Sequence, residues 1–371
     1  MRSERLSTIV KIDEKLDIRV QVSESTTDQA WDDFVLNTPG GHHVQTSAWA
    51  RVKATMGWKM SRIIACKDGA IFGGAQVLIR SFPILGSVAY VTKGPLCFEN
   101  DWAVAEIVLE KILKVCQEKR CQLIAIQPPN NGMYLIEMLK VYHFCESTLE
   151  LAPTASLIFD LNKSEEQLFK EVHRSHRKSI RHALREDITI SVGNQSSLEL
   201  FYLLYKATAK RQGFIPFERS YFDSLWKNLH PYGWISLMLA SYQGEAVSGQ
   251  MMVPFRDTVI VKMVGWSGKY PTHHLNEALL WKSILWSKEH GYRYCDFEGL
   301  DPSSARAIIN GTEPPLAKDY FKYAFGGKGI LYPSAFDFVP NKVLNWAYRH
   351  MPPSMEGKSI LGRAVEILRK R

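Results

Sequence analysis

The chain has 371 residues, of which 46% are hydrophobic and 23% charged. This composition is that of an ordinary globular protein, and it excludes extensive disorder or a fibrous repeat. Lysine and arginine outnumber aspartate and glutamate by 46 to 38, a formal net charge of +8. The excess favours a polyanionic partner: nucleic acid, acidic lipid headgroups or a phosphorylated small molecule.

No stretch reaches the roughly 18 uninterrupted apolar residues of a membrane span. The N-terminus, MRSERLSTIVKIDEKLDIRV, is interrupted by charges and lacks the apolar centre of a signal peptide. We therefore expect a cytoplasmic protein. The six cysteines form no C-x-x-C pair and lie in apolar contexts. They predict reduced, mostly buried thiols, and neither a metal nor a cofactor is expected.

Two segments share an order of features: GWKMSRIIACKDGAIFGGAQVLIR at 57–80 and GWISLMLASYQGEAVSGQMMVPFR at 233–256. Each begins with Gly-Trp, turns at a glycine, contains a second glycine and ends in arginine. Downstream, LEKILKVCQEKRCQLIAIQ (109–127) aligns without a gap on LWKSILWSKEHGYRYCDFE (280–298). Offsets of 171 to 176 residues separate the matching positions. A period of this length indicates a duplicated domain.

Each copy predicts strand, glycine turn, strand, strand, helix, strand. The elements are expected at 61–67, 71–80, 86–92, 103–119 and 121–127, and again at 234–242, 245–255, 258–266, 276–290 and 293–298. This order resembles the GNAT-type acyltransferase fold. We expect an α/β (α+β) protein with two tandem GNAT-like domains, each a mixed, mostly antiparallel sheet flanked by helices. The domains are predicted at 1–160 and 161–345, with a basic C-terminal helix at 346–371.

Seven motifs follow one another between about Ala30 and Pro333: HVQTSAWARVKATMGW, GGAQVLIR, AYVTKGP, RSHRKSIRHALRED, YKATAKRQGF, LNEALLWKSILWSKEHGYRYCDFEG and KDYFKYAFGG. Together they resemble the FemABX family, tRNA-dependent aminoacyl transferases that build peptidoglycan cross-bridges. Some members carry a long coiled-coil arm in the second domain. Here no sustained heptads flank the short segment before the helix at 198–212, so the chain resembles the armless form.

The resemblance implies transfer of an amino acid from aminoacyl-tRNA to an amine of a precursor stem peptide. Both UDP-linked and lipid-linked muropeptides are open as acceptors. The amine attacks an activated ester, and a fixed cation near the developing oxyanion stabilises the transition state. Accordingly, the sequence shows neither a G-x-S-x-G elbow nor a Cys-His pair at a recognisable spacing.

By resemblance, Phe321 and Lys322 contact the aminoacyl end of the tRNA. We expect Lys322 to supply the cation and Phe321 to stack on the terminal adenine. The alternative is a surface lysine beside a core phenylalanine.

Asp296 and Glu298 lie two residues apart at the end of a predicted strand, and so on one face. An amine with a pKa of about 10.4 needs assistance to lose its proton at neutral pH, and these carboxylates are candidates for that role. Three alternatives remain open: loop capping, pairing with Arg293, and proton transfer through the tRNA ribose hydroxyl.

By resemblance, Lys53 and Arg211 hold the nucleotide-linked muropeptide. Lys53 lies one helical turn after Trp49, which we place in the same site. Arg211 ends a predicted helix, and its planar fork suits bidentate phosphate binding. Tyr221 is expected to support them, and Asn276 either binds substrate or caps a helix. The alternatives are a solvated lysine and a cation at a helix C-terminus.

One predicted helix, 173–186, carries a basic face. Its members are spaced i, i+3, i+4, i+7 and i+11: Arg174, Arg177, Lys178, Arg181 and Arg185. Ile180 and Leu184 are expected on the opposite side. No acidic residue interrupts the face, which predicts contact with tRNA phosphates or anionic headgroups rather than a merely solvated surface. The basic segment 358–371 is expected either to rest on the inner membrane surface or to pack on the second domain.

Two other functions remain open. One is an acyl-CoA-dependent N-acyltransferase of the GNAT type. The loops KGPLCFENDW and VGWSGKYPTHHLNE lack the compact basic-x-x-Gly-x-Gly/Ala pattern of a pyrophosphate cradle, which argues against CoA. The other is a non-enzymatic protein that binds RNA or a membrane through the basic helix and the aromatic residues.

Overall fold

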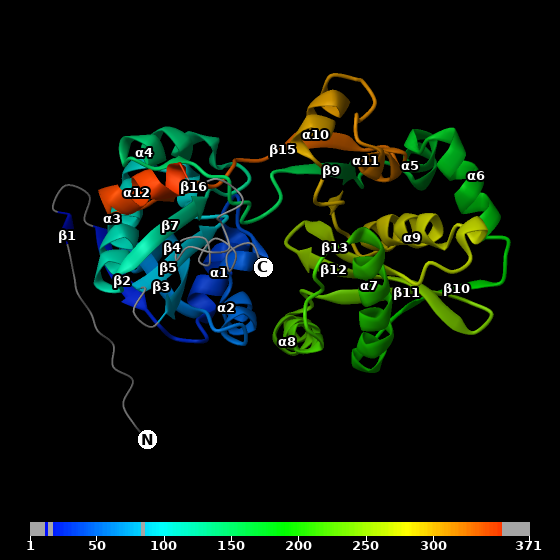
Figure 1. The fold of residues 1–371 in the computed structure, drawn as a ribbon, viewed down its shortest axis with the longest axis horizontal. Helices are drawn as coiled ribbons and strands as arrows, with labels where there is room; N and C mark the ends of the chain where they lie inside the picture. Colours follow the sequence, from blue (N-terminus) through cyan, green and yellow to red (C-terminus); the bar gives the residue numbers. More distant parts are fainter. Residues whose placement is uncertain (1–11, 14–17, 83–85, 351–371) are drawn as a thin grey trace. The chain divides into compact units, whose positions relative to one another are not determined.

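The chain forms two compact units in a computed structural model that describes residues 12–13, 18–82 and 86–350 (Figure 1). The first unit comprises Met1–Ala152 and Tyr332–Arg371, and the second comprises Pro153–Leu331. Each has its own mostly antiparallel sheet flanked by helices, so the predicted fold class is confirmed.

The sheet of the first unit has the order β1-β2-β3-β4-β5-β7-β16-β8, and β6 pairs with β4. Its strands are β1 (Ile12–Asp13), β2 (Ile18–Ser23), β3 (Lys59–Lys67), β4 (Ala70–Phe82), β5 (Gly86–Thr92), β6 (Leu96–Cys97), β7 (Cys121–Gln127), β8 (Cys145–Glu146) and β16 (Phe336–Phe338). Strands β5 and β7 are parallel because α3 (Trp102–Glu118) connects them as a crossover. The other helices are α1 (Gln29–Asn37), α2 (Ser47–Ala54), α4 (Leu135–Val141) and α12 (Lys342–Arg349).

The sheet of the second unit has the order β10-β11-β12-β13-β14-β9-β15. Its strands are β9 (Ala155–Asp160), β10 (Ile188–Val192), β11 (Ser236–Tyr242), β12 (Glu245–Phe255), β13 (Thr258–Trp266), β14 (Tyr294–Asp296) and β15 (Lys328–Leu331). Helix α9 (Leu275–Glu289) is the crossover between the parallel strands β13 and β14. The remaining helices are α5 (Glu165–Glu171), α6 (Arg174–Ala183), α7 (Leu198–Gln212), α8 (Arg219–Leu229), α10 (Pro302–Ile309) and α11 (Ala317–Tyr323).

The predicted duplication is visible in the strand pairing, because β2-β3-β4-β5-β7 corresponds to β10-β11-β12-β13-β14. Both copies turn at a glycine with a left-handed backbone, Gly69 (φ 82°) and Gly244 (φ 77°). Both also have a β-bulge two residues before the second glycine, where Phe72 and Val247 are the extra residues. Each copy therefore repeats an irregularity as well as a strand order.

One strand in each sheet is exchanged between the copies. Strand β9 follows the first unit along the chain but lies between β14 and β15, whereas β16 follows the second unit but lies between β7 and β8. The units therefore divide after Ala152 and after Leu331. These boundaries differ from the predicted ones after 160 and 345, which followed chain order. Of the predicted tail helix, residues 351–371 lie outside the described residues.

Each unit buries its own apolar core against the crossover helix. In α3, Val104, Val108 and Ile112 are at most 1% exposed, and in α9 Leu280 and Ile284 are at most 4% exposed. The i, i+4 spacing places these residues on one helical face against the sheet. All six cysteines are free thiols, as predicted; four are buried, Cys66 is half-buried and Cys145 on β8 is exposed. Among the helices of the described ranges, none is long and apolar enough to span a bilayer.

Candidate functional site

Lys322 lies in the last turn of α11 and is half-buried. Its ammonium donates hydrogen bonds to the backbone carbonyl oxygens of Glu298, at 2.6 Å, and Gly299, at 3.3 Å. The left-handed backbone of Gly299 (φ 86°) lies at the turn that presents both carbonyls to one cation. Burial lowers the pKa of the Lys322 ammonium, against the opposing effect of nearby carboxylates, chiefly Asp319.

The two predicted carboxylates lie beside this cation but have different partners. Asp296 is buried at the end of β14, and its carboxylate accepts a hydrogen bond from the hydroxyl of Ser156 on β9. Glu298 follows the strand and forms an ion pair with Lys262 of β13 at 2.6 Å. Arg293, the partner considered from the sequence, lies over the ring of Tyr294 at 5.0 Å instead.

The sequence prediction missed both Ser156 and Lys262. Lys262 left a usable signal, because it is the one charge inside the apolar strand TVIVKMVGW. Ser156 left no such signal. It lies on β9, whose place beside β14 does not follow from the order of the strands along the chain.

Phe321 connects α11 to the basic helix α6. Its half-buried ring packs against His176 at 5.2 Å and against Phe325 at 5.6 Å. The Nε2 atom of His176 also lies 3.2 Å from the Phe321 carbonyl oxygen. Burial lowers the pKa of His176, which favours a neutral imidazole that donates Nε2–H to this carbonyl. The predicted tRNA-binding helix and the predicted Phe-Lys pair are therefore in contact.

The basic face of α6 is largely exposed, as expected for an anion-binding surface. Arg174, Lys178 and Arg181 are exposed, as is Arg185 beyond the helix end, whereas Arg177 is half-buried and donates to the Lys170 carbonyl at 2.8 Å. The buried side consists of His176, Ile180 and Ala183. The prediction for Leu184 was wrong: it is 46% exposed, because the helix ends at Ala183.

Arg211 and Tyr221 occupy neighbouring elements of the second unit. Arg211 lies near the end of α7, which Gly213 caps, and its guanidinium stacks 4.6 Å from the Trp266 ring centroid. It also donates to Thr208 Oγ1 at 3.2 Å. Tyr221 on α8 is buried, and burial, with lesser effects from Tyr205 and Glu298, raises the pKa of its hydroxyl.

Asn276 is not the N-cap of α9, which corrects one interpretation offered from the sequence. The helix begins at Leu275, so His274 occupies the cap position with a left-handed φ of 55°. The Asn276 side-chain oxygen instead accepts a hydrogen bond from the Ser248 hydroxyl on β12. One residue of difference in the helix start accounts for the change of role.

Lys53 and Trp49 belong to the first unit, on α2. Lys53 is only 5% exposed, a low value for a lysine. Its Nζ lies 5.3 Å from the Trp49 ring centroid and 3.7 Å from Met56 Sδ. Lys53 and Trp49 therefore lie side by side, as their spacing predicted. The alternative of a solvated lysine was wrong, because Lys53 is buried.

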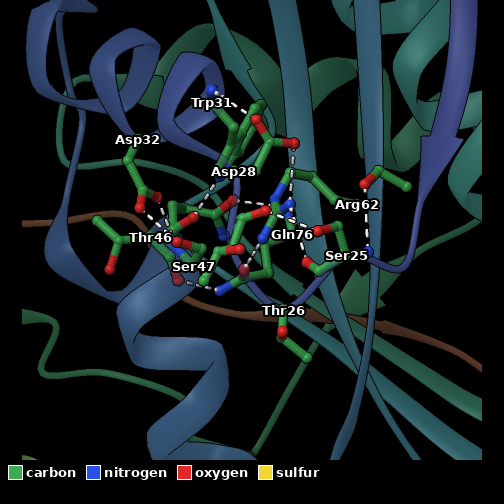
Figure 2. Close-up of polar contacts among 12 residues, drawn as sticks. Ser25, Thr26, Asp28, Trp31, Asp32, Thr46, Ser47, Arg62 and Gln76 are labelled. Carbon is green, nitrogen blue, oxygen red and sulfur yellow. Dashed lines mark hydrogen bonds and ion pairs between the residues drawn. The ribbon is translucent and has the colours of Figure 1, made fainter. Parts of the chain in front are cut away.

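A buried polar network fixes the helix that carries Lys53 (Figure 2). Arg62 of β3 is fully buried and forms an ion pair with Asp28, the N-cap of α1, at 3.1 Å. Its Nη2 donates to Gln76 Oε1 at 3.3 Å, and Gln76 Nε2 donates to the carbonyl of Thr46, the N-cap of α2, at 2.9 Å. Asp32 of α1 accepts from the Ser47 backbone N–H at 2.6 Å. The first turn of α2 is thus tied to the sheet and to α1.

Within the described residues, no cluster of three metal-ligating side chains occurs.

Comparison with known proteins shows which fold class the chain has. Residues 170–305 match the model of an acetyltransferase (GNAT) domain, and with the repeated sheet order this makes the protein a tandem GNAT-fold protein. Residues 26–135 match the model of the FemAB family. This match and the curated relatives below support the resemblance to the FemABX family that the motifs indicated.

Relatives and solved structures agree with this placement. The lipid II:glycine glycyltransferase of Staphylococcus haemolyticus (strain JCSC1435) is 28% identical over 232 residues, 60% of this chain and 55% of the relative. That of Staphylococcus aureus (strain MRSA252) is 27% identical over 224 residues, 57% and 53% of the two chains. This chain therefore spans about half the length of these curated relatives. The crystal structure of FemX shares the fold, with a TM-score of 0.76 and 20% identity over 88% of this chain and 99% of that one.

Proposed function

We propose that the protein is an aminoacyl transferase that moves an amino acid from aminoacyl-tRNA to an amine of a peptidoglycan precursor stem peptide. The observation that carries the proposal is the half-buried Lys322 ammonium, held by two backbone carbonyls near the carboxylates of Asp319, Glu298 and Asp296. The glycyltransferase relatives support the same reaction class.

The reaction needs a cation more than it needs a nucleophile from the protein. The acceptor nitrogen attacks the ester carbonyl carbon and forms the new C–N bond, while the carbonyl oxygen becomes an oxyanion. Collapse of this intermediate breaks the C–O bond to the ribose, and the proton lost by the amine ends on the ribose oxygen. Lys322 would donate to the oxyanion, and a donor of this kind contributes about 3–4 kcal/mol to transition-state stabilisation.

The remaining predicted residues would bind the two substrates. The exposed cations of α6 suit the phosphates of tRNA. Each contact between a cation and a phosphate releases counterions and so raises the affinity, and added salt weakens this contribution. Arg211 in the second unit and Lys53 beside Trp49 in the first each suit a precursor diphosphate or carboxylate. Tyr221 and Asn276 remain proposed substrate-binding residues of the second unit. Because the named relatives use lipid II, we propose a lipid-linked acceptor and peripheral contact with the inner membrane surface.

The test is to incubate the purified protein with charged tRNAs and with soluble or lipid-linked precursors, and to identify the product by mass. Transfer to either precursor supports the function, and the preferred precursor decides between the two acceptors. Lys322→Ala should reduce transfer by about 100-fold or more. Lys269→Ala, which removes an exposed lysine of the same unit, is the matched control. Equal transfer by both variants would remove Lys322 from the mechanism.

The GNAT-domain match favours a second candidate, acyl-CoA-dependent N-acyl transfer. Titration calorimetry with acetyl-CoA separates the two. Tight binding would favour this candidate, and lack of binding would leave the tRNA-dependent reaction.

A further inference from the structure

We propose that Lys262 and Glu298 form a positioning pair for Lys322, and that this pair is a specialisation of the second copy of the repeat. The inference rests on the proposed function of Lys322. It differs from the role considered for Glu298 from the sequence, in which the carboxylate takes a proton from the attacking amine.

Glu298 contacts two lysines through two different groups. Its carboxylate Oε2 lies 2.6 Å from Lys262 Nζ, and its backbone carbonyl oxygen accepts from Lys322 Nζ, also at 2.6 Å. The side chains of Lys262 and Glu298 are 22% and 10% exposed, so the ion pair is largely removed from water. A carboxylate neutralised in this way is a poor base, because its charged form is stabilised.

The backbone places Lys262 by a β-bulge. Val261 pairs with Met252 and Met263 pairs with Met251, so Lys262 is the extra residue of β13. A bulge of this kind redirects a side chain out of the regular alternation of the strand. The charge that interrupts an apolar strand is therefore the one that the bulge aims at Glu298.

The first copy of the repeat provides an internal comparison. In the parallel ladders, Val88 pairs with Leu123 as Thr258 pairs with Tyr294. Counting four residues onward along each strand makes Thr92 the equivalent of Lys262 and Gln127 the equivalent of Glu298.

Gln127 has a structural role in the first copy. It is fully buried, and its side-chain amide donates to the backbone carbonyls of Ala152, at 3.1 Å, and Pro333, at 3.0 Å. Thr92 and Gln127 are a neutral pair at the end of the parallel ladder of the first copy. The sheet of the first copy therefore forms without an ion pair at this position. The charged pair of the second copy is therefore not required by the fold, and its charges are available for a function.

The pair acts on Lys322 through charge balance. The groups that face Lys322 are Asp319 and Lys318 on α11, Asp296 on β14, and Glu298 after it. Across the Phe321 carbonyl lies His176 of α6. Without Lys262, the Glu298 carboxylate would lose this ion pair, and its attraction for the Lys322 ammonium would increase. The ammonium would then leave the two carbonyls, and its pKa would rise.

The experiment compares K262M, E298Q, K262R and the double variant K262T/E298Q, which installs the residues of the first copy. Transfer kinetics, thermal unfolding and the pH dependence of Lys322 acetylation by acetic anhydride, read by mass spectrometry, are measured for each. K262M should lower kcat by at least about 10-fold with little change in KM, and K262R should restore most of it. The control is K269M, which removes the exposed ion pair with Glu245 on the same unit.

The double variant separates positioning from proton transfer. If the pair positions Lys322, each single variant breaks the ion pair and leaves one of its two charges in place, and K262T/E298Q should be more active than E298Q. If Glu298 is the base, the double variant should be no better than E298Q, which would overturn the inference. Unchanged melting of K262T/E298Q would confirm that the neutral pair is compatible with the fold.

The acetylation measurement is independent of the proposed function. In K262M the apparent pKa of Lys322 should rise relative to the wild type, even if no aminoacyl transfer is found. A Lys322 pKa that is the same in K262M and wild type would overturn the positioning role. Absence of transfer by the wild-type protein would count against the proposed function alone.

Discussion

The ring of Trp31 lies directly against Gly74, so closely that a Cβ on this glycine would come within 2.6 Å of the indole and 2.3 Å of the Ile63 carbonyl oxygen. Phe201 and Gly249 repeat the contact in the second copy, where the nearest atom is the terminal Leu239 Cδ2 at 2.7 Å. Each copy thus uses a glycine on its second long strand to admit an aromatic ring from the preceding helix.

The two glycines should respond differently to alanine. Gly74→Ala meets a backbone oxygen and a rigid ring, and we expect it to lower the free energy of unfolding by about 1–3 kcal/mol. Gly249→Ala meets the end of a flexible side chain and should cost less. Chemical denaturation of both variants checks the ranking, and a larger loss for Gly249→Ala would contradict it.

The Asp28–Arg62 ion pair should contribute strongly to the stability of the first unit. Asp28→Asn keeps an N-cap side chain on α1 but leaves the fully buried Arg62 without its carboxylate. We expect a loss of about 3–5 kcal/mol in the free energy of unfolding, as for other broken buried pairs. Asp33→Asn, an exposed residue of the same helix, should stay within about 0.5 kcal/mol. Similar values for both would show that Arg62 finds another partner.

The lowered pKa of Lys322 predicts an alkaline limb in the transfer rate. The ammonium is charged below this pKa, so the cation available to the oxyanion is lost as pH rises through it, earlier than for a free lysine. Lys322→Arg keeps its charge throughout this range. The ratio of wild-type to Lys322→Arg kcat/KM should therefore fall with rising pH, and a flat ratio would contradict the prediction. The acceptor amine titrates equally in both proteins and cancels.

The exposed face of α6 predicts a salt-dependent affinity for tRNA. Each cation that contacts a phosphate adds about 0.7–0.9 to the slope of log K against log salt. Arg174→Gln combined with Lys178→Gln should lower this slope by about 1–2 and weaken binding of tRNA of any sequence. Lys140→Gln, an exposed lysine of α4 in the first unit, should leave the slope unchanged. Fluorescence anisotropy at several salt concentrations measures both, and equal slopes would exclude this face.

Local features of the sequence were enough to predict the repeat and most of its elements. The turn glycines, the alternation of the strands and the amphipathic stripe of α3 act over a few residues, so periodicity reveals them. Phe321 and Lys322, which the family resemblance singled out, lie in one short helix. Helix ends were less accurate, as His274 and Leu184 show, because capping depends on single residues.

Only the tertiary structure decided which distant residues meet. Strand β9 was expected in the first sheet and β16 in the second, but each lies in the other sheet. This exchange places Ser156 of β9 beside Asp296 of β14. Lys262 and Glu298 lie 36 positions apart and meet because a bulge turns one side chain toward the other. Such contacts arise from sheet order and register, which are set by burial of the whole core and not by the pattern of any one segment.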